Sequence, residues 1–505
     1  MLSEEAFLRY GDHGFSLAPL WRTLPLPAGA DPLALYQALA NQGQDYLFET
    51  GHWRDGAFQR AYSVIGLPCR ERVELDEGRL RHWRDGQLLR ELECADPLAE
   101  LAKLQQGWRA PHFSALPPFS GGLFGYFGFE TTRLIEPRLR RQPRKPSGLA
   151  LPDALQWLSL DLLVLDHQQA SVYCIVHEAA EAAGYARGQQ RLLRLCEQTR
   201  ALLAEPSAPP PAFAADATAD PALDYAFARE DFQQAVGRIK DYIAAGDVMQ
   251  VVLSQRMSQP FAADAPTLYR ALSGLGETPY RYLLNLGDAQ IVGASPEMLF
   301  RQQDERITSR PMAGTRRRGA DAAEDQDLRR ELLADPKEIA EHMMLVDLAR
   351  NDLGRLAELG SVQVDELLTV EPFSHVMHIV STVSGKLPQQ AQALDVLKST
   401  FPAGTLSGAS KVRALEVIAE LEPHSRGVYG GSIGYIGWRG NADQAITIRT
   451  GVLQDGRLHV QAGAGVVQDS LAEREWQETL EKSRLMLLAA KLAAAAARQE
   501  EAICI

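Results

Sequence analysis

The sequence predicts an α+β fold, because helical and strand-like patterns are mixed without the regular strand–helix–strand alternation of a doubly wound parallel sheet. Two early apolar runs, ALQWLSLDLLVLD and ASVYCIVHEA, are typical of buried strands, and a long helical stretch follows them. Three glycine-containing strand patterns come late in the chain: GVYGGSIGYIGW, AITIRTGVL and LHVQAGAGVV.

Composition and charge narrow the class of protein. The 505 residues, 46% hydrophobic and 23% charged, are those of an ordinary globular protein of roughly two to four domains. The formal net charge of −13 argues against nucleic acid or a membrane surface as partner, since both require a basic footprint. No apolar run reaches the roughly 18 residues of a membrane span, and the start lacks the features of a signal peptide. We therefore expect a cytoplasmic protein whose five cysteines are reduced thiols.

One boundary divides the chain. Residues 204–222 are rich in Pro and Ala and have no hydrophobic periodicity, which predicts a linker. It separates an N-terminal region, residues 1–203, from a C-terminal region, residues 223–505.

Three helices are predicted after this boundary. Apolar spacing in REDFQQAVGRIKDYIAAGD favours a helix that ends at Gly246, followed by a strand in VMQVVLSQRM. A second helix is expected to start at Pro336, with Asp335 as its cap and Glu338 completing a capping box. The last is expected to begin at Ser470.

Two of these helices carry Glu-x-x-Glu, namely Glu338/Glu341 and Glu475/Glu478. Positions i and i+3 share a helix face, and two such faces that meet present the oxygen ligands that Mg²⁺ prefers. A lone motif of this kind is more often a solvated helix face, so the spacing alone leaves both interpretations open.

Other candidates are equally ambiguous by themselves. TFPAGTLSGAS before a helix offers either an anion site or an ordinary capped turn. His378 suits a core histidine as well as a catalyst. Arg449 interrupts an apolar strand and needs a partner, either a bound carboxylate or a structural Asp or Glu. SRPMAGTRRRG, around Ala313, is either a solvated turn or a wall that binds anions.

Taken together, the ordered blocks GDVMQVVLSQR, GASPEMLF, PMAGTRRRG, EHMMLVDLARND, FSHVMHIVS, TFPAGTLSGASKVRA, GVYGGSIGYIG, VQAGAGVV and EREWQETLEKS resemble the signatures of the chorismate-utilising enzymes. The resemblance is dense from Tyr225 to Ala490 and looser before it. It implies a sandwich of large antiparallel β-sheets with helices packed outside.

Two positions indicate the branch of this family. Members that use water carry a lysine where Gln250 stands, and an amide cannot act as a general base. Members that aminate the para position carry a nucleophilic lysine where Ala313 stands. The chain therefore resembles anthranilate synthase component I, the large subunit, in which ammonia adds at ring carbon C2.

The resemblance also implies roles for matching residues. Mg²⁺ is expected on Glu341 and Glu478, with Glu338 and Glu475 lining the same site. The substrate carboxylates are expected on Tyr429, Arg449 and Thr405 and on N–H groups near Gly463 and Gly465. Glu297 corresponds to the general acid, with Lys482 close by, and His378 to the residue needed for pyruvate elimination.

Ammonia requires a source. No cysteine lies in the Gly-x-Cys-x-Gly setting of a glutamine amidotransferase, so a separate glutamine amidotransferase subunit, anthranilate synthase component II, is expected as a partner in a hetero-oligomer.

The region that matches the family's tryptophan-binding effector site departs from its usual pattern. Leu-Leu-Glu-Ser is replaced by LFET, with Glu49 and Thr50, and Pro-Ser-Pro-Tyr-Met by ETPYR, with Pro279, Tyr280 and Arg281. A cation in an apolar indole pocket is costly unless it is paired, which predicts weak or no tryptophan inhibition. That behaviour suits anthranilate made for phenazines or quinolones. The alternative is that Arg281 snorkels outward and the site still works.

Two other functions remain open from the sequence. One is an enzyme that stops at 2-amino-2-deoxyisochorismate, and the other is a non-catalytic paralogue that binds chorismate or tryptophan. The presence of His378 and of every expected site residue favours the full synthase.

Overall fold

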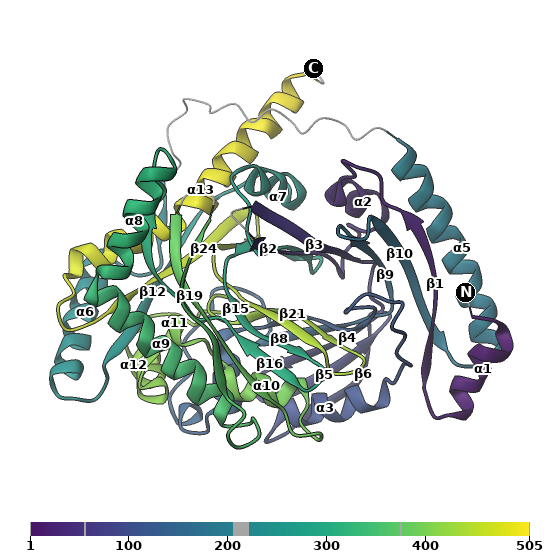
Figure 1. The fold of residues 1–505 in the computed structure, drawn as a ribbon, viewed down its shortest axis with the longest axis horizontal. Coiled ribbons are helices and arrows are strands. Elements are labelled where there is room, and N and C mark those ends of the chain that lie inside the picture. Colours follow the sequence, from purple (N-terminus) through teal and green to yellow (C-terminus); the bar gives the residue numbers. More distant parts are fainter. Residues whose placement is uncertain (1, 55–56, 206–221, 374–375, 504–505) are drawn as a thin grey trace.

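Two antiparallel β-sheets form the framework of the computed structural model, which describes residues 2–54, 57–205, 222–373 and 376–503. Helices lie outside the two sheets, which face one another (Figure 1). The predicted α+β class and the sandwich are thereby confirmed. Within these ranges, no helix is long and apolar enough to cross a membrane. Most of the predicted linker, and Cys504, lie outside the described residues.

The first sheet combines strands from both sides of residues 206–221. Its spatial order is β1 (Leu17–Pro25), β10 (Ser171–Ala179), β9 (Asp161–Asp166), β3 (Ala57–Gly66), β2 (Asp45–Arg54), β13 (Tyr280–Asn285), β14 (Ala289–Ser295), β23 (Thr450–Gln454), β24 (Arg457–Val466), β12 (Gln250–Pro260) and β11 (Asp224–Tyr225), with β20 (Gly408–Ala409) beside β12.

The second sheet also combines strands from both sides of residues 206–221. Its order is β17 (Met312–Arg317), β19 (Val376–Lys386), β16 (Arg306–Ser309), β15 (Met298–Gln303), β22 (Ala442–Ile446), β21 (Ser432–Gly437), β7 (Gly122–Phe127), β8 (Ala154–Ser159), β4 (Glu71–Asp76), β5 (Arg79–Arg84) and β6 (Gln87–Glu93), with β18 (Gln363–Pro372) beside β19. The N- and C-terminal regions therefore share both sheets.

The chain passes from one sheet to the other inside two of the predicted strand runs. ALQWLSLDLLVLD breaks at Leu160 into β8 and β9, and AITIRTGVL breaks before Thr450 into β22 and β23. Treating either run as one continuous strand is wrong. The physical reason is that nearly all of the residues flanking each break are buried, so apolar periodicity carries no mark of the turn.

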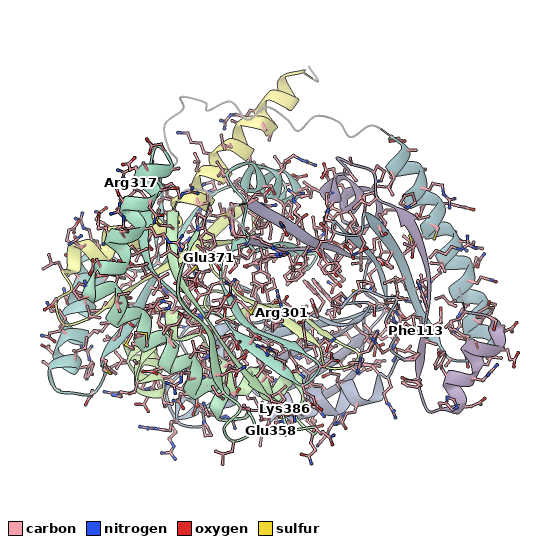
Figure 2. The ribbon with its side chains drawn as sticks, in the orientation of Figure 1. Phe113, Arg301, Arg317, Glu358, Glu371 and Lys386 are labelled. Atoms are coloured by element: carbon pink, nitrogen blue, oxygen red, sulfur yellow. The ribbon has the colours of Figure 1, made fainter. Side chains whose placement is uncertain are left out.

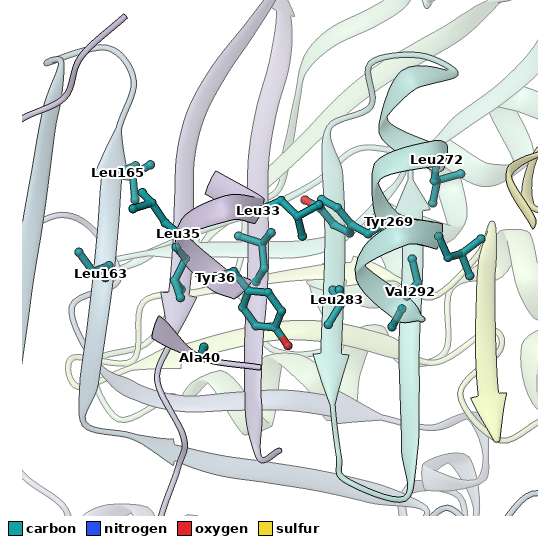
Figure 3. Close-up of a cluster of buried hydrophobic side chains, with 14 of the residues drawn as sticks. Leu33, Leu35, Tyr36, Ala40, Leu163, Leu165, Tyr269, Leu272, Leu283 and Val292 are labelled. Carbon is teal, nitrogen blue, oxygen red and sulfur yellow. The ribbon is translucent and has the colours of Figure 1, made fainter. Parts of the chain in front are cut away.

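Helices cover the outer face of each sheet. One buried cluster joins the first sheet to α1 (Glu4–Asp12), α2 (Pro32–Leu39), α5 (Ala182–Ala204), α7 (Ala265–Gly274) and α13 (Ala472–Ile503). Figure 3 shows part of it, with Tyr36 of α2 and Tyr269 of α7 against the strands. A second cluster joins the other sheet to α3 (Pro97–Gly107), α9 (Pro336–Gly354) and α10 (Ala393–Thr400). A third fills the space between the sheets, with Phe48 and Trp157.

The predicted helices are present with adjusted ends. α6 (Arg229–Ala244) is followed by Gly246 at φ +80°, as the glycine predicts. Asp335 accepts the N–H groups of Lys337 and Glu338 at the start of α9. The last helix, α13, begins at Ala472 rather than Ser470, because the Ser470 hydroxyl accepts from the Val467 N–H instead. The remaining helices include α8 (Ala322–Ala334), α11 (Gly404–Ser407) and α12 (Lys411–Leu421).

Candidate active site

Two neighbouring crossovers between the sheets bring Glu297 and Arg449 together. Glu297 follows β14 and precedes β15, and Arg449 lies between β22 and β23. The Ile446 N–H donates to the Glu297 carbonyl at 3.0 Å, and the Ala294 N–H donates to the Arg449 carbonyl at 3.2 Å. The backbone therefore fixes both side chains at the seam between the sheets.

Glu297 has the properties of a proton donor at neutral pH. Its carboxyl is buried and accepts a hydrogen bond from Thr405 Oγ1 of α11 at 2.9 Å. Burial raises the pKa of Glu297 to about 7, against the opposing influence of Thr405, Arg449 and Lys482. A carboxyl tuned to this range can protonate a leaving hydroxyl.

Arg449 is a partly buried cation without a carboxylate of its own. Its φ of +52° is the left-handed region that non-glycine residues rarely adopt, and such backbone concentrates at functional sites. Burial lowers the pKa of Arg449, while Tyr429, Glu297 and Glu478 act in the opposite direction. Within the described residues, no carboxylate pairs with the guanidinium. The arrangement suits an external carboxylate.

Tyr429 and two glycines form the next part of the wall. Tyr429 is buried, and burial raises its pKa to about 12, so the phenol stays protonated and can donate. A Cβ at Gly463 of β24 would lie 2.9 Å from the Tyr429 hydroxyl, and one at Gly465 would lie 2.7 Å from Gln250 Nε2. Only glycine allows these side chains to approach the strand so closely.

The four predicted metal carboxylates lie on α9 and α13. Lys482 Nζ contacts Glu478 at 2.7 Å and the Gly463 carbonyl at 3.0 Å, while Gln250 Nε2 approaches Glu341 at 3.5 Å. Burial raises the pKa of Glu341, and the negative charges of Glu338 and Glu478 raise it further.

Glu475 and Glu338 complete this set. Burial raises the pKa of Glu475, as does the charge of Glu478, which indicates that the carboxylates of α9 and α13 repel one another. Glu338 accepts from Arg316 Nη1 at 3.1 Å. Among the described side chains, no three His, Cys, Asp or Glu already form a metal-binding cluster. The donor set nevertheless fits Mg²⁺ in type, because it consists of carboxylate oxygens with partly unopposed charge.

His378 lies on β19 opposite the strand that carries Ala313. Its Nδ1 is 3.0 Å from the Gly314 carbonyl. A carbonyl only accepts, so Nδ1 carries the proton and Nε2 keeps its lone pair. Burial, together with the charge of Arg449, lowers the pKa of His378 to about 4 against the opposing effect of the Gly314 hydrogen bond, which keeps the ring neutral at pH 7. The ring can therefore accept a proton.

The arginine-rich stretch contains strand β17, and its arginines bind the protein's own carboxylates. Arg316 pairs with Asp335, Glu331 and Glu338. Arg317, labelled beside α8 in Figure 2, pairs with Glu324 of that helix, and Arg318 pairs with Asp325. Neither the solvated turn nor the anion-binding wall describes it. The run of Asp and Glu between residues 321 and 338 is the sequence signal for these pairs.

The predicted effector residues lie on β2 and just before or on β13, which is paired with β14. Arg281 is only 3% exposed, so the alternative that it snorkels outward is wrong. Its Nη1 donates to Glu49 at 3.4 Å and its Nη2 to Glu277 at 3.2 Å. Ser63 and Tyr269 also donate to Glu49, so this carboxylate is fully engaged.

A cavity with about 610 Å³ of open space, mouth included, lies on the opposite face of the same strands. Phe48, Thr50, Tyr435 and Arg301 line it, and Figure 2 shows Arg301 between the two sheets. Arg281 is absent from this lining, because alternate residues of a strand face opposite sides.

Pro279 and Tyr280 complete the predicted effector set. The Pro279 carbonyl accepts from the Gly51 N–H at 2.9 Å, and the Tyr280 hydroxyl donates to Asp443 at 2.7 Å. Asp443 lines the cavity, so Tyr280 supports its wall from β13.

Known proteins match almost the whole chain. The family described as "chorismate binding enzyme" matches residues 46–488. Anthranilate synthase component 1 of Pseudomonas aeruginosa is 46% identical over 97% of this chain and 99% of that protein, and the Neisseria meningitidis serogroup C protein is 42% identical over the same shares. The crystal structure of anthranilate synthase component I from Streptococcus pneumoniae aligns with a TM-score of 0.73 and 34% identity, covering 92% of this chain and 99% of that one.

A more distant structure shares the fold. The menaquinone-specific isochorismate synthase of Escherichia coli aligns with a TM-score of 0.65 at 19% identity, over 96% of this chain and 98% of that one.

Proposed function

The chain belongs to the chorismate-binding enzyme family, and from this premise we propose that it is the large subunit of an anthranilate synthase, which converts chorismate and ammonia to anthranilate and pyruvate. The observation that carries this proposal is that Arg449, a cation without an ion-pair partner among the described residues, and Glu297, a buried acid, lie at the same seam between the sheets. The reaction requires both groups, since the substrate is a dicarboxylate that loses a hydroxyl.

Substrate binding begins with the enolpyruvyl carboxylate. Arg449 supplies charge and Tyr429 a phenolic donor, while the glycines of β24 leave room for the ligand to approach backbone N–H groups near Gly463 and Gly465. Thr405 lies close to the position expected for the ring carboxylate. Lys482 of α13 reaches the same region, where its Nζ donates to the Gly463 carbonyl of β24.

The first chemical step replaces a hydroxyl with nitrogen. Glu297 donates its proton to the C4 hydroxyl, which leaves as water, while ammonia adds at C2. Both ring double bonds shift, from C1–C2 to C1–C6 and from C5–C6 to C4–C5, and the added nitrogen releases one proton to solvent. Gln250 cannot activate water, and Ala313 offers no nucleophile that would compete with ammonia.

A divalent cation is part of the proposal. Glu341 and Glu478 are its expected ligands, with Glu338 and Glu475 beside them, and the repulsion among these carboxylates supports the assignment. Bound Mg²⁺ supplies positive charge for the ring carboxylate.

His378 serves the second step. Its Nε2 accepts the proton from the ring carbon that bears nitrogen, the enolpyruvyl ether bond breaks, and the ring becomes aromatic. The released enolate takes a proton to give pyruvate. A neutral, oriented imidazole supports the full synthase over an enzyme that stops at 2-amino-2-deoxyisochorismate.

Ammonia is supplied by a glutamine amidotransferase subunit, component II, in a cytoplasmic hetero-oligomer. The printed name "component 1" of the relatives supports a second component.

Tryptophan inhibition is expected to be weak, and the product to serve secondary metabolism such as phenazines or quinolones. Support comes from Glu49, whose carboxylate is already bound by Arg281 and therefore unable to bind a ligand's ammonium group. The reason differs from a cation that fills an indole pocket, because Arg281 does not line the neighbouring cavity.

The test is the purified chain with chorismate, Mg²⁺ and ammonium, followed by anthranilate fluorescence and pyruvate release, with and without tryptophan. Both products are expected in equal amounts. Turnover without pyruvate would identify the aminated intermediate as the product, and binding without turnover a non-catalytic paralogue. Ala313→Lys is expected to impair anthranilate formation, and an unchanged rate would contradict the role of Ala313.

A further inference from the structure

A second charged recess lies behind the wall of the active site. It has about 490 Å³ of open space, mouth included, between the segment 129–145 and helix α12, which is at the lower left of Figure 1. Arg133, Lys145, Glu130 and His424 are among its lining residues. Buried Arg426 separates it from Tyr429, since its guanidinium carbon lies 5.7 Å from the centre of the Tyr429 ring.

Two of the cations that line this recess form no ion pair with a described carboxylate. Arg133 and Lys145 donate to the backbone carbonyls of Gln142 and Glu420, and within the described part of the chain neither forms an ion pair. The other lining cations are different, because Arg144 is paired with Asp153 and Arg426 with Glu422.

A third uncompensated cation lies next to the recess. Buried Arg256 of β12 donates to the Ser147 carbonyl at 2.5 Å, while its Nη1 has no hydrogen-bond partner in the described structure. The adjoining Pro146 and Lys145 carbonyls accept from Ser425, which ties Arg256 to the recess lining. Nδ1 of the neighbouring His424 is likewise buried with no partner among the described residues. Buried polar groups without protein partners are uncommon, and two of them here lie beside the same recess.

Glu130 is the one lining carboxylate that lacks a cationic partner among the described residues. It accepts backbone N–H groups from Arg426 at 2.8 Å and Gly427 at 2.9 Å. Burial and the charge of Asp153 raise the pKa of Glu130 to about 7, so at neutral pH it is a weak counter-charge for three cations.

We propose that this recess is a binding site for a small dianion, held by Lys145 and Arg133 and by the field of Arg256. Two cations without carboxylate partners at the rim, with a third behind them, suit a phosphate or a pair of carboxylates. The site is distinct from the proposed chorismate site, because Arg426 and Phe129 stand between them.

The experiment is isothermal titration of the full-length chain with inorganic phosphate and, separately, with malonate, at constant ionic strength set by chloride. Saturable binding of at least one probe is expected, and the tighter probe identifies the class of ligand. Lys145→Gln and Arg133→Gln are each expected to weaken binding about tenfold. Arg141→Gln removes a nearby exposed charge outside the lining and should leave the affinity unchanged.

Thermal unfolding of each variant shows whether it is folded. Two rim variants are used, so that the proposal can still be tested if one of them fails to fold. The absence of saturable binding by either probe overturns the proposal. So does equal affinity in wild type, Lys145→Gln and Arg133→Gln, or a loss in Arg141→Gln as large as theirs.

Discussion

Arg449 and Arg281 are both withdrawn from water, yet their surroundings differ. Arg281 is held by Glu49 and Glu277, so its charge is neutralised within the fold. Arg449 stands at a crossover in left-handed backbone with no carboxylate partner among the described residues. The comparison teaches that the number of protein carboxylates paired with an arginine, rather than its burial, distinguishes a structural cation from one that is available to bind a ligand.

The largest effect is expected at the acid beside Arg449. Glu297→Gln removes the proton donor but keeps the shape, and kcat/KM for chorismate should fall about 10²- to 10⁴-fold. In wild type, kcat/KM should decline as pH rises through about 7, since the protonated form is required. Rate measurements from pH 6 to 9 test this, and a wild-type profile flat across that range contradicts the role.

Stability should respond to pH at the same residue. The folded pKa of Glu297 lies above its ordinary value of 4.5, so the folded protein loses stability as pH rises from there to about 7. Glu297→Gln avoids this loss, and its thermal midpoint should exceed that of wild type by more at pH 8 than at pH 5. An equal difference at both values would contradict an ionised carboxylate in the buried site.

Arg449→Gln is the next variant. It removes a charge-assisted pair of hydrogen bonds to substrate, which is expected to lower kcat/KM about 10²- to 10³-fold. The thermal midpoint should be unchanged or higher, because no protein carboxylate loses its partner. A fall in midpoint with kcat/KM retained would show that Arg449 is structural.

Arg281→Met should behave in the opposite way. Leaving Glu49 buried without its cation is expected to cost about 3 kcal/mol in the free energy of unfolding at pH 7, with kcat within threefold of wild type. Although burial raises the pKa of Glu49, Arg281 and Arg60 lower it below its ordinary value. The stability that Arg281 provides is therefore present above that value and lost in acid, so denaturant unfolding at pH 4 should show a smaller difference.

The smallest effect is expected at Arg316. Its contact with Glu338 competes with a bound cation, so Arg316→Gln should tighten Mg²⁺ binding about threefold in the absence of chorismate, as for other partly exposed pairs. Titration calorimetry measures this directly. Arg317→Gln, on the same strand but paired with Glu324, is the matched control. Weaker Mg²⁺ binding in Arg316→Gln would mean that the arginine positions Glu338 instead.

Local signals in the sequence predicted the α+β class and the helices α6 and α9, while the resemblance to the family implied the site residues and their roles. The breaks at Leu160 and before Thr450 were not predictable, because burial on both sides hides a change of sheet. Cross-strand partners were equally hidden. Arg281 meets Glu49 only because β13 pairs with β2 in one register, which a single sequence does not specify.

The most direct measurement is the equilibrium binding of chorismate to Arg449→Gln and Arg281→Met, compared with wild type. The unpartnered cation should be the one that binds substrate, so Arg449→Gln should lose at least a hundredfold in affinity, while Arg281→Met stays within threefold. Equal losses in the two variants, or none in Arg449→Gln, would contradict the account.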